Sequence, residues 1–149
     1  MAHYTDLKKE LARYSRTYRN PKLPPLELSG LYALFPENHK TLPKGVTGHW
    51  PDDDWPNGDE AGVYIFLGSK FNLLYIGKTS LLKLKDRLSA YFRYGDLNRC
   101  RIPDEHGWTE KPEFVVTIGI LAKTAFESAA LEEYLISRLQ PSQNTIGIK

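Results

Sequence analysis

Two tyrosines, each close to a glycine in a short apolar run, are the first residues of this sequence that could carry chemistry. Tyr64 lies in GVYIFLG and Tyr75 lies in LLYIG, eleven positions later. If these runs form neighbouring strands, the two phenols face one region, although a tyrosine in a strand is most often a half-buried packing residue. Directly after the second run, Gly77 permits close backbone approach and Lys78 supplies a positive point charge. The stretch GKTS is not a P-loop, because the upstream glycine spacing of that motif is missing.

A cation and a carboxylate further along the chain lie in expected helices, next to apolar positions. Arg87 is at the edge of an apolar stripe, where an arginine either supplies charge or lays its stem on the surface. Glu132 falls near the middle of the apolar arc of a helix expected over residues 125–141. The arc contains Ala125, Ser128, Ala129, Leu135, Ile136 and Leu139. Because a buried, unpaired Glu is costly, Glu132 either is paired, binds a metal or lines a cleft, or else the helix is rotated and Glu132 lies on its rim.

These residues belong to a five-part pattern of motifs: GVY, YIGK, RLSAYF, ESAALEEYLI and PSQN. In this order of motifs, the chain resembles the GIY-YIG nuclease family from about Gly62 to Asn144. It is most similar in motif to the N-terminal nuclease domain of UvrC-type excinucleases. One departure is the segment between YIG and Arg87, which is about two residues longer than in the excinuclease branch. This difference affects where the following helix begins. It does not affect the assignment of Arg87, because RLSAYF fixes which residue matches the arginine of the family.

The resemblance implies a role for each residue around the two tyrosines. Tyr64 corresponds to the tyrosine that acts as general base on the attacking water. Tyr75 corresponds to the tyrosine that supports the site by hydrogen bonding. Lys78 and Arg87 match a cationic pair near the scissile phosphate, and Gly77 is expected to lie against the substrate.

Three further catalytic positions follow from the resemblance. Tyr91 occupies a position held by Tyr or His in different branches, Glu132 matches the single metal-binding glutamate, and Asn144 matches a structural or phosphate-side asparagine. A lone carboxylate holds Mg²⁺ weakly, since Mg²⁺ keeps several waters and takes ligands from substrate phosphate. The expected cofactor is therefore one Mg²⁺ or Mn²⁺ ion, bound at Glu132.

The implied reaction is consistent with the chemistry of these side chains. Phosphodiester hydrolysis must activate water, stabilise charge on the phosphorus oxygens and neutralise the departing alkoxide. A free tyrosine, with a pKa of about 10, is a poor base at neutral pH. Nearby Lys78, Arg87 and a divalent cation would favour the phenolate or an oriented proton relay. Arg87 is the better clamp for the phosphorane oxygens, because its fork can bind two of them.

The pattern of apolar residues predicts the elements that position this site. Helices are expected over 5–18 (capped by Thr5 or Asp6), 81–92 and 125–141, and strands over 62–68, 71–77 and 113–121. The first two strands form a hairpin, and residues 20–60 are irregular apart from a short strand in GLYALF. The expected fold is α/β (α+β), with a small three-stranded, mainly antiparallel sheet in β-β-α-β-α order flanked by helices. Residues 1–60 form an N-terminal extension and residues 61–149 the nuclease domain.

Composition and charge limit the classes of protein that fit. The 149 residues suit one domain, the single cysteine, Cys100, excludes an internal disulfide framework, and no apolar run is long enough to span a membrane. We therefore expect a cytoplasmic protein. Residues 70–101 carry eight Lys and Arg against two Asp, and residues 8–22 carry six against one Glu. Two basic stretches can present a cationic face to a polyanion, and they can also be ordinary solvated helix faces.

The first helix illustrates both alternatives for the basic stretches. Lys8, Arg16 and Arg19 fall broadly on one side, opposite Leu7 and Leu11. Those three cations are expected to contact phosphates that flank the cleavage site, unless the helix only supports the core.

The leading hypothesis is a divalent-metal-dependent DNA endonuclease of restriction, mobile-element or repair type. It acts on double-stranded or branched DNA, and a dimer is possible. The alternative is a non-catalytic nucleic-acid-binding module with a GIY-YIG fold. Every expected catalytic position is filled, which favours the enzyme.

Overall fold

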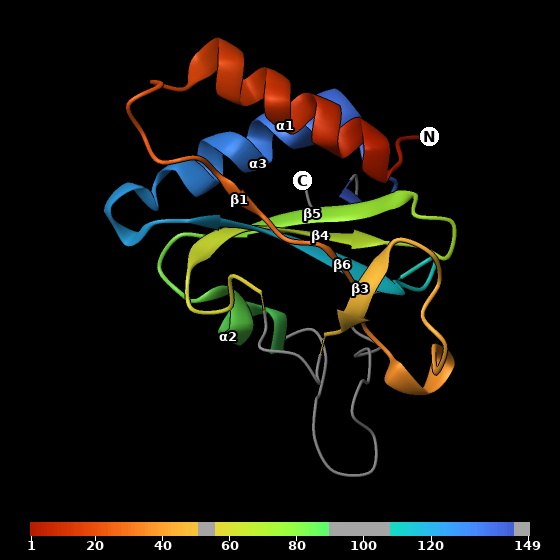
Figure 1. The fold of residues 1–149 in the computed structure, drawn as a ribbon. Helices are drawn as coiled ribbons and strands as arrows, with labels where there is room; N and C mark the ends of the chain where they lie inside the picture. The colour runs from red at the N-terminus through yellow and green to blue at the C-terminus, as the bar shows by residue number, and fades with distance from the viewer. Residues whose placement is uncertain (51–55, 90–107, 145–149) are drawn as a thin grey trace.

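A mixed sheet of six strands forms the centre of the structure, with helices on both of its faces (Figure 1). The computed structural model describes residues 1–50, 56–89 and 108–144. The strands are β1 (Glu27–Leu28), β2 (Leu31–Ala33), β3 (Val46–His49), β4 (Ala61–Leu67), β5 (Leu73–Thr79) and β6 (Phe114–Ile120). Their order is β3-β2-β6-β4-β5, with β1 also paired to β6.

The α+β class is confirmed, but the predicted count of three strands is wrong. The three extra strands come from the N-terminal extension and are two to four residues long. Both β1 and β2 pair antiparallel with β6, and β3 pairs parallel with β2, which makes the sheet mixed. The extension therefore completes the sheet of the predicted nuclease domain, while the boundary at residue 60 stays a prediction.

The predicted hairpin is confirmed and forms the part of the sheet nearest the candidate site. Strands β4 and β5 pair antiparallel, with Tyr64 opposite Gly77 and Phe66 opposite Tyr75. On its other side β4 pairs with β6. Because side chains alternate along a strand, Tyr64, Phe66 and Tyr75 share one face of the sheet.

Three α-helices cover the sheet, and two of them share a face. Helices α1 (Tyr4–Tyr18) and α3 (Glu127–Leu139) lie together on one side, and α2 (Leu84–Ser89) lies on the other (Figure 1). Two short 3-10 turns, η1 (Pro36–Asn38) and η3 (Ala122–Thr124), complete the regular structure described. Helix α2 begins three residues later than expected, so Leu81 lies outside the apolar stripe assigned to it.

The start of α1 is attached to the turn of the β4–β5 hairpin. The backbone N–H of Tyr4 donates to the carbonyl of Phe71 (3.0 Å), and the N–H of Leu73 donates to the carbonyl of Ala2 (2.9 Å). The helix is capped at His3, whose N–H donates to the Asp6 carboxylate (2.9 Å), and not at Thr5 or Asp6 as predicted. Such a contact satisfies a backbone donor that the first turn would leave unpaired.

The sheet separates two apolar clusters. The larger one packs α1 and α3 on the face that carries Val63, Ile65 and Ile76. The smaller one lies on the α2 face and includes Tyr64 and Phe66. All five side chains are fully buried, so alternate residues of the GVY and YIG strands contribute to different cores.

A carboxylate of α3 joins this helix to α1, and the sequence pattern did not predict it. Glu127 is 8% exposed and accepts hydrogen bonds from the Tyr14 hydroxyl (2.9 Å) and from the Arg19 guanidinium (2.7 and 2.9 Å). The hydrogen bonds lower the pKa of Glu127 against the opposing effect of burial. Burial and the Glu127 hydrogen bond raise the pKa of Tyr14 to about 12.

A second carboxylate also joins these two helices, but this one belongs to α1 and its partners belong to α3. Glu10 of α1 accepts hydrogen bonds from the Tyr134 hydroxyl (2.8 Å) and from the Arg138 guanidinium (3.2 Å) of α3. The Arg138 contact is the main cause of the lowered pKa of Glu10. Between the two pairs, the rings of Tyr14 and Tyr134 lie 5.2 Å apart. Helix α3 is therefore fixed against α1 at two points along its length.

We expect Glu127→Gln to lower the free energy of unfolding at neutral pH by about 2 kcal/mol, because it weakens a buried charge pair. A carboxylate whose folded pKa is depressed contributes stability above its ordinary pKa of 4.5, and loses it as the pH falls through the lower folded value. The variant should therefore lose less stability between neutral pH and acid than the unchanged protein. Urea unfolding at several pH values measures both effects, and exposed Glu133→Gln is the control. Parallel pH profiles for Glu127→Gln and the unchanged protein would contradict this assignment.

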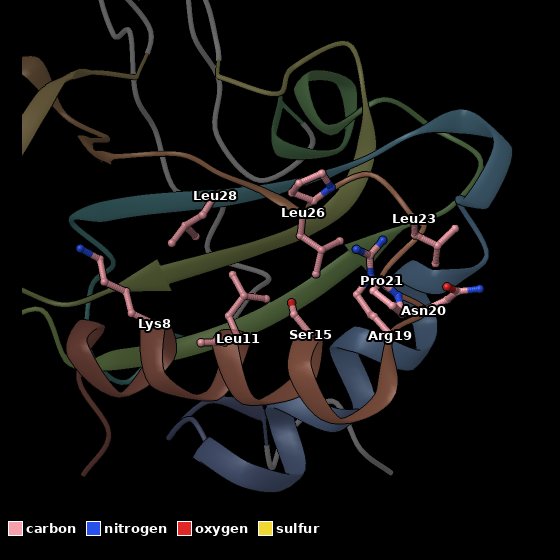
Figure 2. A pocket seen from close by; sticks show the side chains of 11 residues that line it. Lys8, Leu11, Ser15, Arg19, Asn20, Pro21, Leu23, Leu26 and Leu28 are labelled. Atoms are coloured by element: carbon pink, nitrogen blue, oxygen red, sulfur yellow. The ribbon is translucent and has the colours of Figure 1, made fainter.

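A groove of about 540 Å³ runs between α1 and the segment that follows it (Figure 2). Leu11 and Ser15 of α1 line one side, and Leu23, Leu26 and Leu28 line the other. Among the described residues, no helix is both long and apolar enough to cross a membrane.

Candidate active site

Tyr64, the proposed base, lies in the middle of β4 with its ring directly over a glycine of the next strand. Its side chain is 1% exposed. A Cβ on Gly77 would come within 2.3 Å of the Tyr64 hydroxyl oxygen and of the ring carbon that bears it. The absence of a side chain at Gly77 therefore makes room for the phenol. The group that approaches the backbone of Gly77 closely is therefore the Tyr64 ring. We no longer expect Gly77 to contact the substrate.

We expect Gly77→Ala to displace the Tyr64 phenol, because the new methyl group would overlap it. Overpacking of this kind costs about 1–3 kcal/mol of stability. If the phenol acts on the reacting water, the rate should fall by more than the fraction of unfolded protein explains. Cleavage rates measured well below the melting temperature test this. Gly45→Ala is the control for a destabilising glycine substitution without overlap, since Gly45 has a positive φ that strains an alanine but nothing within 4 Å of an added Cβ. An unchanged rate for folded Gly77→Ala would contradict the placement.

Tyr75 lies beside Tyr64 and is more accessible. Their ring centroids are 6.3 Å apart with an interplanar angle of 30°, and the Tyr75 side chain is half-buried. Phe66 and Trp108 complete an aromatic group, with the Trp108 ring 5.9 Å from that of Tyr75. The two motif tyrosines thus come together as predicted, and their surroundings hold both rings in place.

Lys78 follows Gly77 on β5 and lies on the opposite face of the sheet from the tyrosines. It pairs with Val63, whose side chain belongs to the core under α3. Unlike Val63, the Lys78 side chain is exposed. Because β5 is the last strand of the sheet, a site that uses Tyr75 and Lys78 must extend around its edge.

Arg87 lies on α2, whose start is held by the chain just before β4. The N–H of Leu84 donates to the carbonyl of Glu60 (2.8 Å), and the N–H of Lys85 donates to the carbonyl of Gly58 (3.0 Å). These contacts satisfy two donors of the first helical turn. Buried Leu84 and Leu88 fix the apolar side of α2 against the tyrosine cluster and leave Arg87 partly exposed.

Glu132 lies on the rim of α3, and not in the middle of its buried stripe as predicted. The buried side chains of α3 are Glu127, Ser128, Leu131, Leu135 and Leu139. Ala129, placed on the predicted arc, is exposed, so the helix is rotated relative to the prediction. The rim alternative is therefore correct, and Glu132 is half-buried where α3 meets β5.

Both predicted cations affect the pKa of Glu132. Burial raises the pKa of Glu132, Lys78 opposes this, Glu133 adds to it, and Arg87 opposes it with the smallest effect. The carboxylate, from α3, therefore lies within range of Lys78 of β5 and Arg87 of α2. Because the net pKa is raised, its negative charge is incompletely compensated and would be stabilised by a further cation.

Among the described residues, Glu132 belongs to no group of three carboxylates, histidines or cysteines that could enclose a metal ion. One accessible carboxylate fits an ion that keeps its waters and takes further oxygens from a phosphate. It does not fit a structural metal site, which would need a closed set of protein ligands.

Asn144 binds the backbone of β5. Its amide oxygen accepts from the N–H of Ile76 (2.8 Å), and its amide nitrogen donates to the carbonyl of Ile76 (2.8 Å). The side chain is 4% exposed, so both polar ends serve the backbone between Tyr75 and Gly77. These contacts favour the structural alternative for Asn144. Tyr91, the other predicted catalytic position, lies outside the described residues.

The basic side of α1 differs from the prediction at Arg19. Its guanidinium is 8% exposed, contacts Glu127 and donates to the carbonyl of Pro24 (2.8 Å). Arg19 is therefore withdrawn from the predicted phosphate contacts. Arg16 is exposed, and the Lys8 ammonium lies 4.8 Å from the ring centre of Tyr4. For these two cations the contact with DNA stays a prediction.

Comparison with known proteins agrees with this arrangement. A family model described as the UvrC-like GIY-YIG domain matches residues 60–145. UvrABC system protein C of Methanothermobacter thermautotrophicus is 35% identical over 86 residues, 58% of this chain and 13% of that protein. Its counterpart in Microcystis aeruginosa is 38% identical over 87 residues, again 58% and 13%. That of Wolbachia pipientis is 36% identical over 85 residues, 57% and 13%.

The shared region is a small part of these relatives and more than half of this chain. It contains Tyr64, Tyr75, Lys78, Arg87 and Glu132, and it ends just after Asn144. Helix α1 and strands β1–β3 precede it. The resemblance predicted from the motifs is therefore confirmed, and the chain belongs to the family of UvrC-like GIY-YIG domains.

Proposed function

We propose that this protein is a divalent-metal-dependent DNA endonuclease that hydrolyses phosphodiester bonds in DNA repair. The observation that carries the proposal is that Lys78 and Arg87, from two other elements, both act electrostatically on the half-buried Glu132. A carboxylate and two cations at the edge of β5, next to paired tyrosines, suit a bound phosphodiester. The repair role rests on the relatives, which are named as the C protein of the UvrABC system.

Each side chain has a defined part in the proposed reaction. Tyr64, as the phenolate, accepts a proton from the attacking water and becomes the neutral phenol, and Tyr75 stacks beside it. Arg87 binds the non-bridging phosphate oxygens, and Lys78 adds a positive charge on the other face of the sheet. Glu132 would hold the metal ion, Mg²⁺ or Mn²⁺, which would supply positive charge to the phosphate and the leaving oxygen.

Cleavage assays with plasmid, branched duplex and single-stranded DNA test the proposal. With Mg²⁺ or Mn²⁺ we expect cleavage of at least one duplex substrate, and with EDTA none. Preference for branched or damaged duplexes over intact plasmid would support the repair role. Tight DNA binding without cleavage in the presence of either metal would overturn the endonuclease proposal and favour a non-catalytic DNA-binding module.

A further inference from the structure

Two adjacent leucines between β5 and α2 are exposed to solvent. Leu81 is 98% exposed, the highest value among the large apolar side chains described, and Leu82 is 57% exposed. The periodicity of the sequence placed Leu81 in the stripe of the next helix, but α2 begins only at Leu84. Neighbouring Leu84 and Leu88 do enter the core, so the exposure is specific to the pair that precedes the helix. We call Leu81 and Leu82 the leucine tip.

The chain on both sides of the leucine tip is held by hydrogen bonds. The Thr79 hydroxyl donates to the carbonyl of Leu82 (2.7 Å) and accepts from its N–H (3.1 Å). Thr79 is itself 5% exposed at the end of β5. Beyond the tip, the N–H of Leu84 donates to Glu60. The leucines are therefore presented outward on an anchored turn, which reduces the entropy lost when they bind a partner.

The surroundings of the leucine tip are basic and continuous with the candidate active site. Lys78 precedes it, Lys83 and Lys85 follow it, and residues 78–85 contain no acidic side chain. Lys83 and Lys85 both approach Asp59, at 3.6 and 2.7 Å, in exposed contacts that phosphates can replace. Arg87 lies one turn further along α2. An apolar group bordered by cations suits a polyanion with an apolar interior, which describes duplex DNA.

We propose that Leu81 and Leu82 form a wedge that enters the DNA duplex beside the bound phosphate and unstacks a base step. Lys83 and Lys85 hold the flanking phosphates while the leucines replace contacts between neighbouring bases. The bend that follows an inserted apolar side chain would turn the scissile phosphate toward Arg87 and Glu132. This inference rests on the proposed endonuclease function, because it takes duplex DNA as the occupant of the site.

The test compares two double variants that differ in polarity at the tip. Leu81→Ser with Leu82→Ser removes the apolar wedge, and Leu81→Met with Leu82→Met keeps it. We expect the serine variant to cleave a fully paired duplex roughly tenfold more slowly, because no apolar side chain then replaces the contacts between the unstacked bases. On a duplex already opened by a small mismatch bubble at the cleavage position, both variants should match the unchanged protein.

Fluorescence of 2-aminopurine placed near the cleavage position reports unstacking without any need for cleavage. In EDTA, binding of the unchanged protein and of the methionine variant should raise the fluorescence, and binding of the serine variant should not. Equal fluorescence and equal cleavage of the paired duplex by the serine variant would overturn the wedge. The wedge would also be overturned if the serine variant changed only the self-association of the protein, as measured by sedimentation. If the unchanged protein unstacks DNA but cleaves none, the endonuclease proposal fails while the wedge stands.

Discussion

Replacing Glu132 by Gln should abolish cleavage while the protein stays folded and still binds DNA. Glu132 is the described carboxylate that faces both Lys78 and Arg87, and glutamine cannot supply the charge that binds a metal ion. The substitution should also raise the melting temperature slightly. Burial raises the pKa of this carboxyl, so its ionised form opposes folding at neutral pH. Cleavage kinetics, thermal unfolding and DNA binding in EDTA measure the three effects.

Glu133→Gln is the matched control for this experiment. Glu133 is adjacent on α3 and exposed, and it influences Glu132 only through its charge. We expect it to keep cleavage activity. Binding of Mn²⁺ to the DNA complex, followed by electron paramagnetic resonance, should be weakened by Glu132→Gln and not by Glu133→Gln. Loss of activity in Glu133→Gln alone would show that the wrong carboxylate has been assigned to the metal.

Arg87→Ala should reduce the cleavage rate by on the order of 10²–10³, which corresponds to about 3–4 kcal/mol of transition-state stabilisation. The arginine fork can bind two phosphorane oxygens at once, and a lysine can supply only a point charge. Arg87→Lys should therefore recover a minor part of the rate. Single-turnover kinetics separate this effect from DNA binding, which should change much less.

Lys70→Ala tests whether the position of Arg87, and not merely its charge, accounts for the effect. Lys70 is exposed and lies in the turn before β5, whereas α2 follows the other end of that strand. We expect this substitution to leave the single-turnover rate close to that of the unchanged protein. Near-normal rates for Arg87→Ala would make Arg87 a surface residue of α2 with no part in the reaction.

The local pattern of the sequence determined the elements that carry the motifs. Strands β4, β5 and β6 and helix α3 all lie within two residues of their predicted bounds. Each has at least seven residues, and its own short apolar run or helical repeat of apolar side chains indicates its type. The hairpin followed from the short connection between two such runs. Because Tyr64 and Tyr75 lie on two of these strands, their approach could be predicted from the hairpin.

The tertiary structure decided the elements that have no local signal of their own. Strands β1, β2 and β3 are too short to be specified by alternation, and they exist because β6 and β2 offer them free edges. The start of α2 was placed wrongly for a related reason. Leu81 fits the helical repeat as well as Leu84 does, but only the carbonyls of Gly58 and Glu60 define which residue begins the helix.

The periodicity of the sequence also could not predict contacts between residues that are far apart in the chain. Glu127 is buried because Arg19 and Tyr14 reach it from 108 and 113 positions away, so α3 turns this carboxylate inward and leaves Glu132 on its rim. Asn144 binds the backbone of Ile76, 68 positions earlier, and thereby fixes the strand between the two site residues Tyr75 and Gly77. A helical repeat reports only how side chains are spaced around one axis. Which side of the helix faces the core depends on partners that only the folded chain brings into contact.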